Sequence, residues 1–470
     1  MRHTRIVCTL GPSSVEVPTL RKLFAAGMDV ARLNFSHGDE ATHRAAVSAV
    51  RQVARETGRY VALLQDLQGP KIRTGSLSEP LVRLARGREV TLTSRNIRGD
   101  ERTIPVSHQE IIAAAQPGDR VLLADGQIEL KVRGPHSNGQ VKCSVIRGGL
   151  LGERKGVAIP GRTLTLPALT EKDKQDMALG AELQFDYVAI SFVRSAADVK
   201  ACRDEQERLG WKVPVVAKLE KLQAIRNLRE IIAASDAVMV ARGDLGVEMA
   251  LGEVPAVQKD IIHRANRAGV PVITATEMLE SMVTSNRPTR AEASDVANAI
   301  WDGTDAVMLS QETSTGAHPV EAVRAMARIC LAAENHPAYL RERPMWKEDS
   351  LSSAIAHASA QVATEVRARY IIAFTESGAT ALRVSKAHPP VPVIAASPYS
   401  SVLRRTALYA GVIPLEVGMG KDTDDMIDKA VKAALKHGIV RDGDRVVLIA
   451  GVPVGKPGQT NMLKVETIRE

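Results

Sequence analysis

The feature that most constrains the fold is a rhythm of eight short apolar runs over the first 310 residues. The runs are rich in β-branched residues and continuous rather than alternating, as expected for strands buried on both faces. Helix-like amphipathic stretches, such as residues 254–268 and 291–301, lie between most of them. Strand followed by helix predicts a parallel sheet, and eight repeats predict an α/β fold closed into a (β/α)₈ barrel. The predicted strands are residues 6–9, 28–33, 60–64, 187–192, 213–219, 237–241, 270–274 and 306–309.

An inserted unit interrupts this rhythm. From about residue 70 to 167 the pattern changes to short alternating strands separated by Gly, Asn and Pro turns, which predicts an all-β insertion. The insertion leaves the barrel from the loop after the third strand, on the face where barrel active sites lie, so we expect a mobile lid. Its predicted strands are residues 89–93, 120–123, 128–133 and 140–146.

A further unit follows the barrel. After a polar, Pro-containing linker at 335–349, a helix at 351–366 and renewed strand–helix alternation predict an open α/β domain. Its predicted strands are residues 370–374, 391–396 and 445–450. We therefore expect three domains: a barrel of residues 1–69 and 168–335, a lid of residues 70–167, and a C-terminal domain of residues 350–470.

Composition excludes several classes of function. Lys and Arg total 62 against 54 Asp and Glu, but they are dispersed, and aromatic residues make up only 3%. These values argue against nucleic acid as a partner, whereas a net charge of +8 suits the steering of anionic phosphates into a cleft. No membrane-spanning run and no apolar signal-peptide core is present, so we expect a cytoplasmic protein without a membrane partner. Four scattered cysteines without metal-ligand spacing indicate a reducing compartment.

Charged residues occur where the fifth and sixth predicted strands end. Lys218 and Glu220 are two apart on one strand and therefore share a face, and Asp244 ends the next strand. Two carboxylates at neighbouring strand ends form a hard oxygen site suited to Mg²⁺. The alternative for Lys218 and Glu220 is a buried ion pair without function, but burying both charges without a role is disfavoured. With Asp244 beside them, the pattern predicts a site for Mg²⁺ and a phosphoryl group.

Other polar residues at strand ends extend this site. Arg32 could hold a phosphate through two parallel hydrogen bonds, although a lone Arg is commonly part of a surface salt bridge. Thr276 and Ser310 follow the seventh and eighth strands, where hydroxyl groups are commonly structural. Nearby side-chain oxygen atoms could hold a monovalent cation, those of Asn34, Ser36 and Asp66.

A second phosphate site is predicted in the C-terminal domain. Residues 375–380 follow a strand and open a helix, and they supply hydroxyl groups, a glycine and free backbone N–H groups. An ordinary helix N-cap with a glycine turn explains the segment equally well. The candidate residues are Thr375, Ser377, Gly378 and Thr380.

These segments resemble the pyruvate kinase family over nearly the whole chain. Its most specific blocks are present in order: ARLNFSHG, GPKIRTG, KLE, MVARGDLGVE, TATEMLESM, MLSQET and PVGKPGQTNMLKV. The resemblance implies a TIM barrel, a small β-barrel lid and a C-terminal α/β regulatory domain. It also implies Mg²⁺- or Mn²⁺-dependent transfer of phosphate from phosphoenolpyruvate to ADP, the final step of glycolysis. The family is usually homotetrameric, and a sugar phosphate or nucleotide effector would bind the C-terminal domain.

The same resemblance assigns roles to individual residues. Glu220 and Asp244 match the Mg²⁺ ligands, while Thr276, through water, is the candidate that positions a proton for the enolate. The catalytic residues expected are Lys218, Arg32, Thr276 and Ser310, of which Ser310 is the weaker candidate. The residues expected to bind substrate are Arg32, Lys218, Gly243, Asp244 and Thr276. The nucleotide-binding positions expected are Asn34, Phe35, Ser36, His37, Arg73 and Lys155.

The chain departs from the family pattern beside the monovalent-cation pocket. Potassium-dependent members usually read Asp-Thr-Lys-Gly-Pro-Glu where this chain reads Asp66-Leu67-Gln68-Gly69-Pro70-Lys71. A lysine head is a compact point charge of the same sign as K⁺. We therefore expect that Lys71 supplies this charge internally, as in a potassium-independent subgroup, and that K⁺ is not required. The pocket expected around it consists of Asn34, Ser36, Asp66 and Leu67.

Two smaller departures concern the proton relay and the effector. Glu277 stands where Gln is common, next to the candidate Thr276. The segment 375–380 lacks an Arg often found after its glycine, which leaves the identity of the effector open.

Two other functions compete with the kinase. A phosphoenolpyruvate-using lyase or aldolase on the same barrel would share the Mg²⁺–enolate chemistry, but it would not need a lid or the positions Arg73 and Lys155. A catalytically silent metabolite-binding protein should have lost some of the site residues, and none of them is missing. ADP-dependent formation of pyruvate distinguishes the kinase from both.

Overall fold

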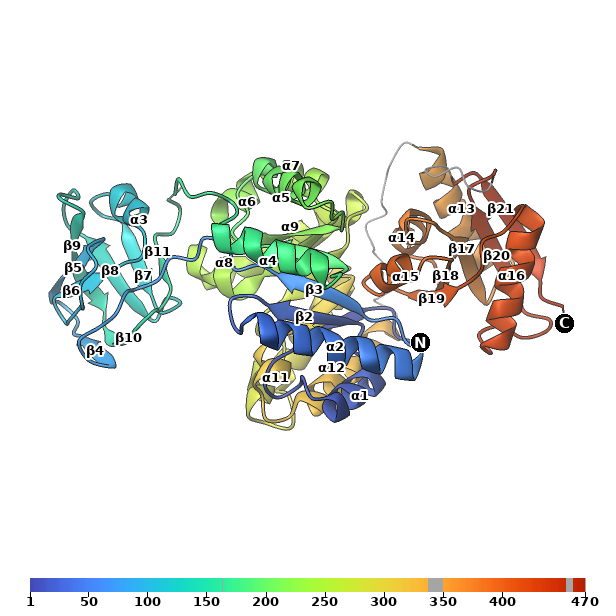
Figure 1. Ribbon diagram of the computed structural model, residues 1–470, viewed down its shortest axis with the longest axis horizontal. Helices are drawn as coiled ribbons and strands as arrows, with labels where there is room; N and C mark the ends of the chain where they lie inside the picture. The colour runs from blue at the N-terminus through green and yellow to red at the C-terminus, as the bar shows by residue number, and fades with distance from the viewer. Residues whose placement is uncertain (163, 337–349, 454–459, 470) are drawn as a thin grey trace.

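Three units lie in a row, with the barrel in the middle, the inserted unit on one side and the C-terminal unit on the other (Figure 1). The computed structural model describes residues 1–162, 164–336, 350–453 and 460–469. Among these residues, no helix has the length and apolar character needed to cross a bilayer.

Eight parallel strands close into a barrel in the order β1-β16-β15-β14-β13-β12-β3-β2. Each predicted strand is present, so the predicted fold class is confirmed. The strands are almost entirely buried, because one face fills the barrel and the other packs against helices. Their bounds are β1 (Arg5–Thr9), β2 (Val30–Asn34), β3 (Ala62–Asp66), β12 (Tyr187–Ile190), β13 (Val215–Leu219), β14 (Ala237–Ala241), β15 (Val272–Ala275) and β16 (Ala306–Leu309).

Helices cover the outside of the barrel (Figure 1). Local sequence sets several of their ends: Thr170 and Thr289 form capping boxes with the carboxylates three residues later, and Gly303 ends a helix at a φ of +101°. The helices are α1 (Val17–Ala26), α2 (Glu40–Thr57), α4 (Glu171–Glu182), α5 (Ala196–Arg208), α6 (Leu222–Arg226), α7 (Leu228–Ala234), α8 (Arg242–Glu248), α9 (Val254–Arg267), α10 (Arg290–Asp302), α11 (Gln311–Ser314) and α12 (Pro319–Glu334), with 3₁₀ turns at Leu251–Glu253 and Glu280–Val283.

The inserted unit, which we call the lid, has its own apolar core. A six-stranded sheet runs in the order β11-β7-β8-β9-β5-β6, and β10 pairs with β4 separately. The four predicted strands correspond to β5 (Glu89–Thr93), β7 (Arg120–Leu123), β8 (Ile128–Val132) and β9 (Gln140–Arg147). Sequence analysis missed β4 (Leu81–Leu84), β6 (Thr103–Pro105), β10 (Gly149–Gly152), β11 (Val157–Ala158) and the helix α3 (Gln109–Ala114).

The C-terminal unit is an open sheet in the order β19-β18-β17-β20-β21, in which only the pairing of β20 with β21 is antiparallel. The three predicted strands correspond to β17 (Tyr370–Phe374), β18 (Val393–Ser397) and β20 (Arg445–Ala450), while β19 (Val412–Glu416) and β21 (Met462–Thr467) were missed. Most of the predicted linker, residues 337–349, lies outside the described residues. The helices are α13 (Leu351–Glu365), α14 (Ala379–Lys386), α15 (Ser400–Thr406) and α16 (Thr423–Lys436).

Candidate active site

The polar strand-end residues lie on one rim of the barrel. Lys218 is on β13, Glu220 follows that strand, and Asp66 ends β3. Arg32 is on β2, where Asn34 is paired in register with Asp66. Because all eight strands are parallel, their carboxyl ends open on this rim, where barrel active sites form.

A buried charge network links four of these residues. The Lys218 ammonium lies 2.8 Å from Glu220 Oε1 and 3.2 Å from Asp66 Oδ1, and Arg32 Nε lies 2.6 Å from Asp66 Oδ2. Burial raises the pKa of Asp66, but the charges of Lys218 and Arg32 outweigh this effect and hold the pKa below its usual value. Burial lowers the pKa of Lys218, but Asp66 and Glu220 raise it above its usual value. The network therefore keeps Lys218 charged at the rim.

Two hydroxyl groups that sequence analysis did not single out complete this network. Lys218 Nζ donates to Ser191 Oγ over 2.8 Å, and Arg32 Nη1 donates to Thr9 Oγ1 over 2.8 Å. Thr9 is the last residue of β1, and Ser191 directly follows β12. Serine and threonine occur at strand ends so commonly that sequence alone does not identify these two as partners.

Glu220 and Asp244 form the carboxylate pair expected to hold Mg²⁺. Burial, and then the neighbouring Glu220 carboxylate, raise the pKa of Asp244 to about 6. A carboxylate that raises the pKa of its neighbour fits a divalent cation that neutralises both. Among the described residues, no group of three or more His, Cys, Asp or Glu side chains could hold a metal ion. In proteins, Mg²⁺ commonly uses one or two carboxylates together with water and substrate oxygens.

Thr276 and Glu277 follow β15 in a backbone conformation that residues with side chains rarely adopt. Their φ angles are +66° and +53°, and such a conformation costs roughly 1–3 kcal/mol at each position. The Gly243 amide donates to Thr276 Oγ1 over 2.8 Å, and Thr276 Oγ1 donates to the Ala275 carbonyl over 2.7 Å. These contacts fix the Thr276 hydroxyl beside the segment that carries Asp244.

Ser310 follows β16. Its hydroxyl oxygen is buried and has no hydrogen-bond partner within the described part of the chain. Its amide donates to Glu312 Oε2 over 2.7 Å, while Glu312 Oε1 accepts from the Leu279 amide over 3.0 Å. The Glu312 carboxylate thereby joins the segments that follow β15 and β16, and the catalytic role of Ser310 stays a prediction.

The loop after β2 carries four of the expected nucleotide positions. Asn34 Oδ1 accepts from the Ser36 amide over 3.1 Å. Phe35 is buried and stacks on the His43 ring with centroids 3.9 Å apart, whereas His37 is exposed. The loop thus has a packed base and a solvent-facing tip. The Phe35 amide donates to the Asp66 carbonyl over 2.9 Å, and the Phe35 carbonyl accepts from Lys172 Nζ over 2.9 Å.

Arg73 and Lys155, the expected nucleotide positions of the lid, lie close to each other. The Arg73 guanidinium donates to the carbonyl of Arg154, the residue before Lys155, over 3.0 Å. Burial, and then the charges of Arg73, Lys71 and Arg32, lower the pKa of His37. The charge of the lid residue Arg73 therefore acts on the loop after β2.

The expected monovalent-cation pocket already contains protein contacts. Both oxygens of Asp66 are within ion-pair distance of cations, as described above. The Leu67 carbonyl accepts from Ser191 Oγ over 2.7 Å. Lys71 lines a cavity of about 90 Å³ together with Glu220 and Asp244. Asp125 and Arg162 of the lid also line this cavity, so it joins the barrel rim to the lid.

The predicted effector segment lies between β17 and α14. Gly378 has a φ of +93°, and its amide donates to Thr375 Oγ1 over 2.8 Å. The Ala379 amide donates weakly to Ser377 Oγ over 3.4 Å, and the Thr380 hydroxyl lies 3.1 Å from that of Thr460. These contacts agree with the helix N-cap alternative, and phosphate binding stays a prediction.

Known proteins share this architecture. The family model described as pyruvate kinase, barrel domain matches residues 1–323, and that described as pyruvate kinase, alpha/beta domain matches residues 353–466. The pyruvate kinases of Staphylococcus saprophyticus and Staphylococcus aureus are each 43% identical to this chain and align with all of it and with 81% of their own length. A solved pyruvate kinase of Cryptosporidium parvum gives a TM-score of 0.92 at 35% identity, with coverage of all of this chain and 96% of that one.

The barrel, its charged rim and these relatives define a phosphotransferase enzyme. More specifically, the chain belongs to the pyruvate kinase family.

Proposed function

We propose that the protein transfers the phosphoryl group of phosphoenolpyruvate to ADP and forms pyruvate and ATP, the final step of glycolysis. The rim cluster supports this most strongly, because Lys218 and Arg32 lie there together with the carboxylate pair Glu220 and Asp244. Phosphoryl transfer needs positioning and neutralised charge more than covalent chemistry. Lys218 and Arg32 supply that charge around the phosphoryl oxygens, and Gly243, Asp244 and Thr276 complete the substrate contacts.

The proposed cofactor is Mg²⁺ or Mn²⁺, held by Glu220 and Asp244. When bound there, such an ion would neutralise phosphoryl oxygens and polarise the enolate oxygen as a Lewis acid. Thr276 positions the proton that the enolate must receive, with Ser310 as a second candidate. A threonine hydroxyl is a poor acid, so Thr276 acts through a water molecule.

ADP binds between the barrel and the lid in this proposal. The loop of residues 34–37 contributes from the barrel, and Arg73 and Lys155 contribute from the lid. The charge effect of Arg73 on His37 supports a shared site. Closure of the lid would exclude water from the transferring group, which strengthens the electrostatic interactions around it.

We also propose that the enzyme does not require K⁺. Lys71 lines the same cavity as Glu220 and Asp244, and its positive charge opposes the rise in the pKa of Asp244. A fixed ammonium at this place can supply the charge that a monovalent cation supplies elsewhere. The four expected pocket residues Asn34, Ser36, Asp66 and Leu67, which are not among the residues that line this cavity, are then structural.

Four further properties follow from family membership and are proposed with it. We infer a homotetramer, a cytoplasmic location, and a sugar phosphate or nucleotide effector that binds at residues 375–380. We also infer domain limits at residues 1–69 with 168–335, 70–167 and 350–470.

The test is formation of pyruvate and ATP from phosphoenolpyruvate, ADP and Mg²⁺, measured for the wild-type protein and for Lys218→Met. We expect the wild-type protein to be active only when ADP is present, and the variant to lose roughly 10³-fold in kcat. Lys200→Met is the matched control, because Lys200 is exposed and pairs with Asp204, four residues away. Pyruvate formation that does not depend on ADP would contradict the proposal.

A further inference from the structure

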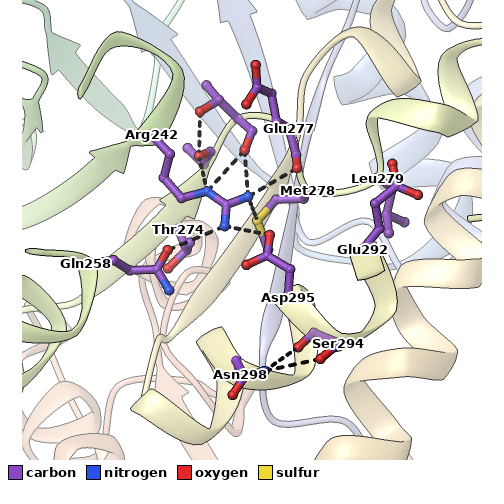
Figure 2. A network of polar contacts seen from close by, with 12 residues as sticks. Arg242, Gln258, Thr274, Glu277, Met278, Leu279, Glu292, Ser294, Asp295 and Asn298 are labelled. Atoms are coloured by element: carbon purple, nitrogen blue, oxygen red, sulfur yellow. Dashed lines mark hydrogen bonds and ion pairs between the residues drawn. The ribbon is translucent and has the colours of Figure 1, made fainter. Parts of the chain in front are cut away.

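Arg242, the first residue of α8, binds the turn that follows β15 (Figure 2). Its Nε lies 3.3 Å from the Ala275 carbonyl oxygen. Its Nη2 lies 2.8 Å from the carbonyl oxygen of Thr276 and 3.2 Å from that of Glu277. One guanidinium therefore donates hydrogen bonds to three successive carbonyl groups, including those of both left-handed residues.

Asp295 on α10 holds the guanidinium from another side. Arg242 Nη1 lies 2.6 Å from Asp295 Oδ2, and Arg242 Nη2 lies 2.8 Å from Met278 Sδ (Figure 2). The Arg242 side chain is only 11% exposed. Because the guanidinium is a planar fork of fixed donors, partners on different edges restrict its rotation.

Arg242 and Gly243, which are consecutive in the chain, thus hold Thr276 through its carbonyl group and its hydroxyl group. The Arg242 side chain binds the Thr276 carbonyl, and the Gly243 amide binds the Thr276 hydroxyl. A β-branched residue at a φ of +66° keeps that conformation only when its surroundings enforce it. Without the guanidinium the turn is expected to relax, and the hydroxyl would leave its place beside Gly243. The same segment continues into Asp244, so it joins the hydroxyl to the carboxylate pair.

We propose that Arg242 is a positioning residue for the proton-transfer half of the reaction and that Asp295 supports it. This inference rests on the proposed role of Thr276. In that step the methylene carbon of the enolate takes a proton from water held by Thr276, and the enolate C–O bond becomes the ketone carbonyl. The hydroxide left behind takes up a proton from bulk solvent. Arg242 touches none of the reacting atoms and acts through the place of the hydroxyl.

The experiment compares Arg242→Gln, Arg242→Lys and Asp295→Asn with the wild-type enzyme. Steady-state assays give kcat and the KM for phosphoenolpyruvate. Exchange of the methyl protons of pyruvate for deuterium, measured by NMR in D₂O with Mg²⁺ and ATP, isolates the proton step. Arg264→Lys is the matched control, because Arg264 is an exposed arginine on α9 that pairs with Asp260 four residues away.

We expect Arg242→Gln to lower both kcat and the exchange rate by roughly 10²-fold. The KM for phosphoenolpyruvate should change by less than about threefold, because the phosphoryl contacts are intact. Arg242→Lys should lose less than Arg242→Gln, since an ammonium keeps the charge that pairs with Asp295. It should still fall below the wild-type enzyme, because an ammonium cannot reach three carbonyls in one plane. Asp295→Asn should lose roughly tenfold through looser orientation of the guanidinium. Arg264→Lys should behave as the wild-type enzyme.

Three results would overturn the inference: unchanged kcat in Arg242→Gln, a rise in KM without loss of exchange, or a loss of kcat with exchange at the wild-type rate. If Arg242→Gln does not fold, the kcat, the KM for phosphoenolpyruvate and the exchange rate of Arg242→Lys and Asp295→Asn test the inference in its place. A wild-type protein that forms no pyruvate would instead contradict the proposed function. Active wild-type enzyme with unaffected variants would contradict only the role of Arg242.

Discussion

Asp66 determines how charge is distributed at the barrel rim. One of its oxygens lies 2.6 Å from Arg32 Nε and the other 3.2 Å from Lys218 Nζ. The Asp66 carboxylate therefore holds both Arg32 and Lys218 in place. Glu220 also lies 2.8 Å from Lys218 Nζ, and it raises the pKa of Asp244, the other carboxylate expected to hold a divalent ion.

Gly243 offers a test of the substrate contacts at the residue scale. A Cβ atom at this position would lie 3.6 Å from Thr276 Oγ1, an ordinary van der Waals contact, so the fold itself accepts alanine. Gly243 is within α8, where alanine is favoured over glycine by roughly 1 kcal/mol. We expect Gly243→Ala to keep or raise the thermal midpoint while it raises the KM for phosphoenolpyruvate at least about tenfold, because the added methyl occupies the substrate's place. An unchanged KM would contradict the contact.

Sequence could place the main site residues but not their partners. Lys218, Glu220 and Asp244 were predictable because a strand end in a parallel barrel fixes where a side chain lies. The partnership of Arg242 with residues after β15 depends on contacts between segments more than 30 residues apart. The periodicity of the sequence does not predict such a contact. The left-handed turn at Thr276 could not be predicted either, because it contains neither glycine nor asparagine, the residues that usually indicate such a turn.

The attachment of the lid to the barrel is the main feature at the scale of elements. In the described part of the chain, residues 159–162 and 164–170 lie between the lid strand β11 and α4, and Arg194, just before α5, binds this segment. Its guanidinium donates to the carbonyls of Leu164 and Leu166 over 2.8 and 2.9 Å, and it lies 3.0 Å from Asp198. This arginine therefore fixes the end of the lid that rejoins the barrel.

Loss of this contact should loosen the lid. We expect Arg194→Gln to increase amide hydrogen exchange in residues 157–162 and 164–166 and to raise the KM for ADP roughly tenfold. The KM for phosphoenolpyruvate should change less, because Arg194 lines the cavity beside Glu220 and Asp244 but its guanidinium binds the lid segment and Asp198. Arg203→Gln on α5 is the control, since Arg203 binds Asp236 and the Ala234 carbonyl far along the chain from the lid segment. Equal exchange in both variants would argue against the role of Arg194.

Four of the lid strands that sequence analysis missed are short. β6 and β11 have three and two residues, and β4 and β10 have four each. Two or three residues carry no clear alternation, so β6 and β11 form because neighbouring strands supply hydrogen-bond partners. The barrel strands were predictable because burial on both faces makes them continuous apolar runs.

At the scale of the whole molecule, buried ion pairs join the barrel to the C-terminal unit. Lys386 at the end of α14 lies 2.6 Å from Asp305, and the two side chains are 1% and 2% exposed. Arg404 of α15 lies 2.8 Å from Asp186, and Tyr187 donates to the Arg405 carbonyl over 2.7 Å. A charge buried this deeply is tolerable only with its partner, so the two units are fixed against each other.

Removal of one member of the buried pair should destabilise the junction. We expect Lys386→Ala to lower the free energy of unfolding by about 3–5 kcal/mol, because Asp305 would be left as a buried, unpaired charge. Urea unfolding followed by circular dichroism measures the change. The exposed pair of Lys432 with Asp428 on α16 provides the control Lys432→Ala, which should cost less than about 1 kcal/mol. Similar losses in the two variants would contradict this view of the junction.

The most direct test measures ATP formation from phosphoenolpyruvate, ADP and Mg²⁺ by the wild-type protein and by Lys71→Glu, each in K⁺-free buffer and with added KCl. We predict equal wild-type rates in both buffers, and a variant that is active only with KCl, because it has lost the internal cation. Wild-type activity that appears only with KCl would contradict the role of Lys71. Folded wild-type protein that forms no ATP in either buffer would contradict the phosphoryl transfer itself.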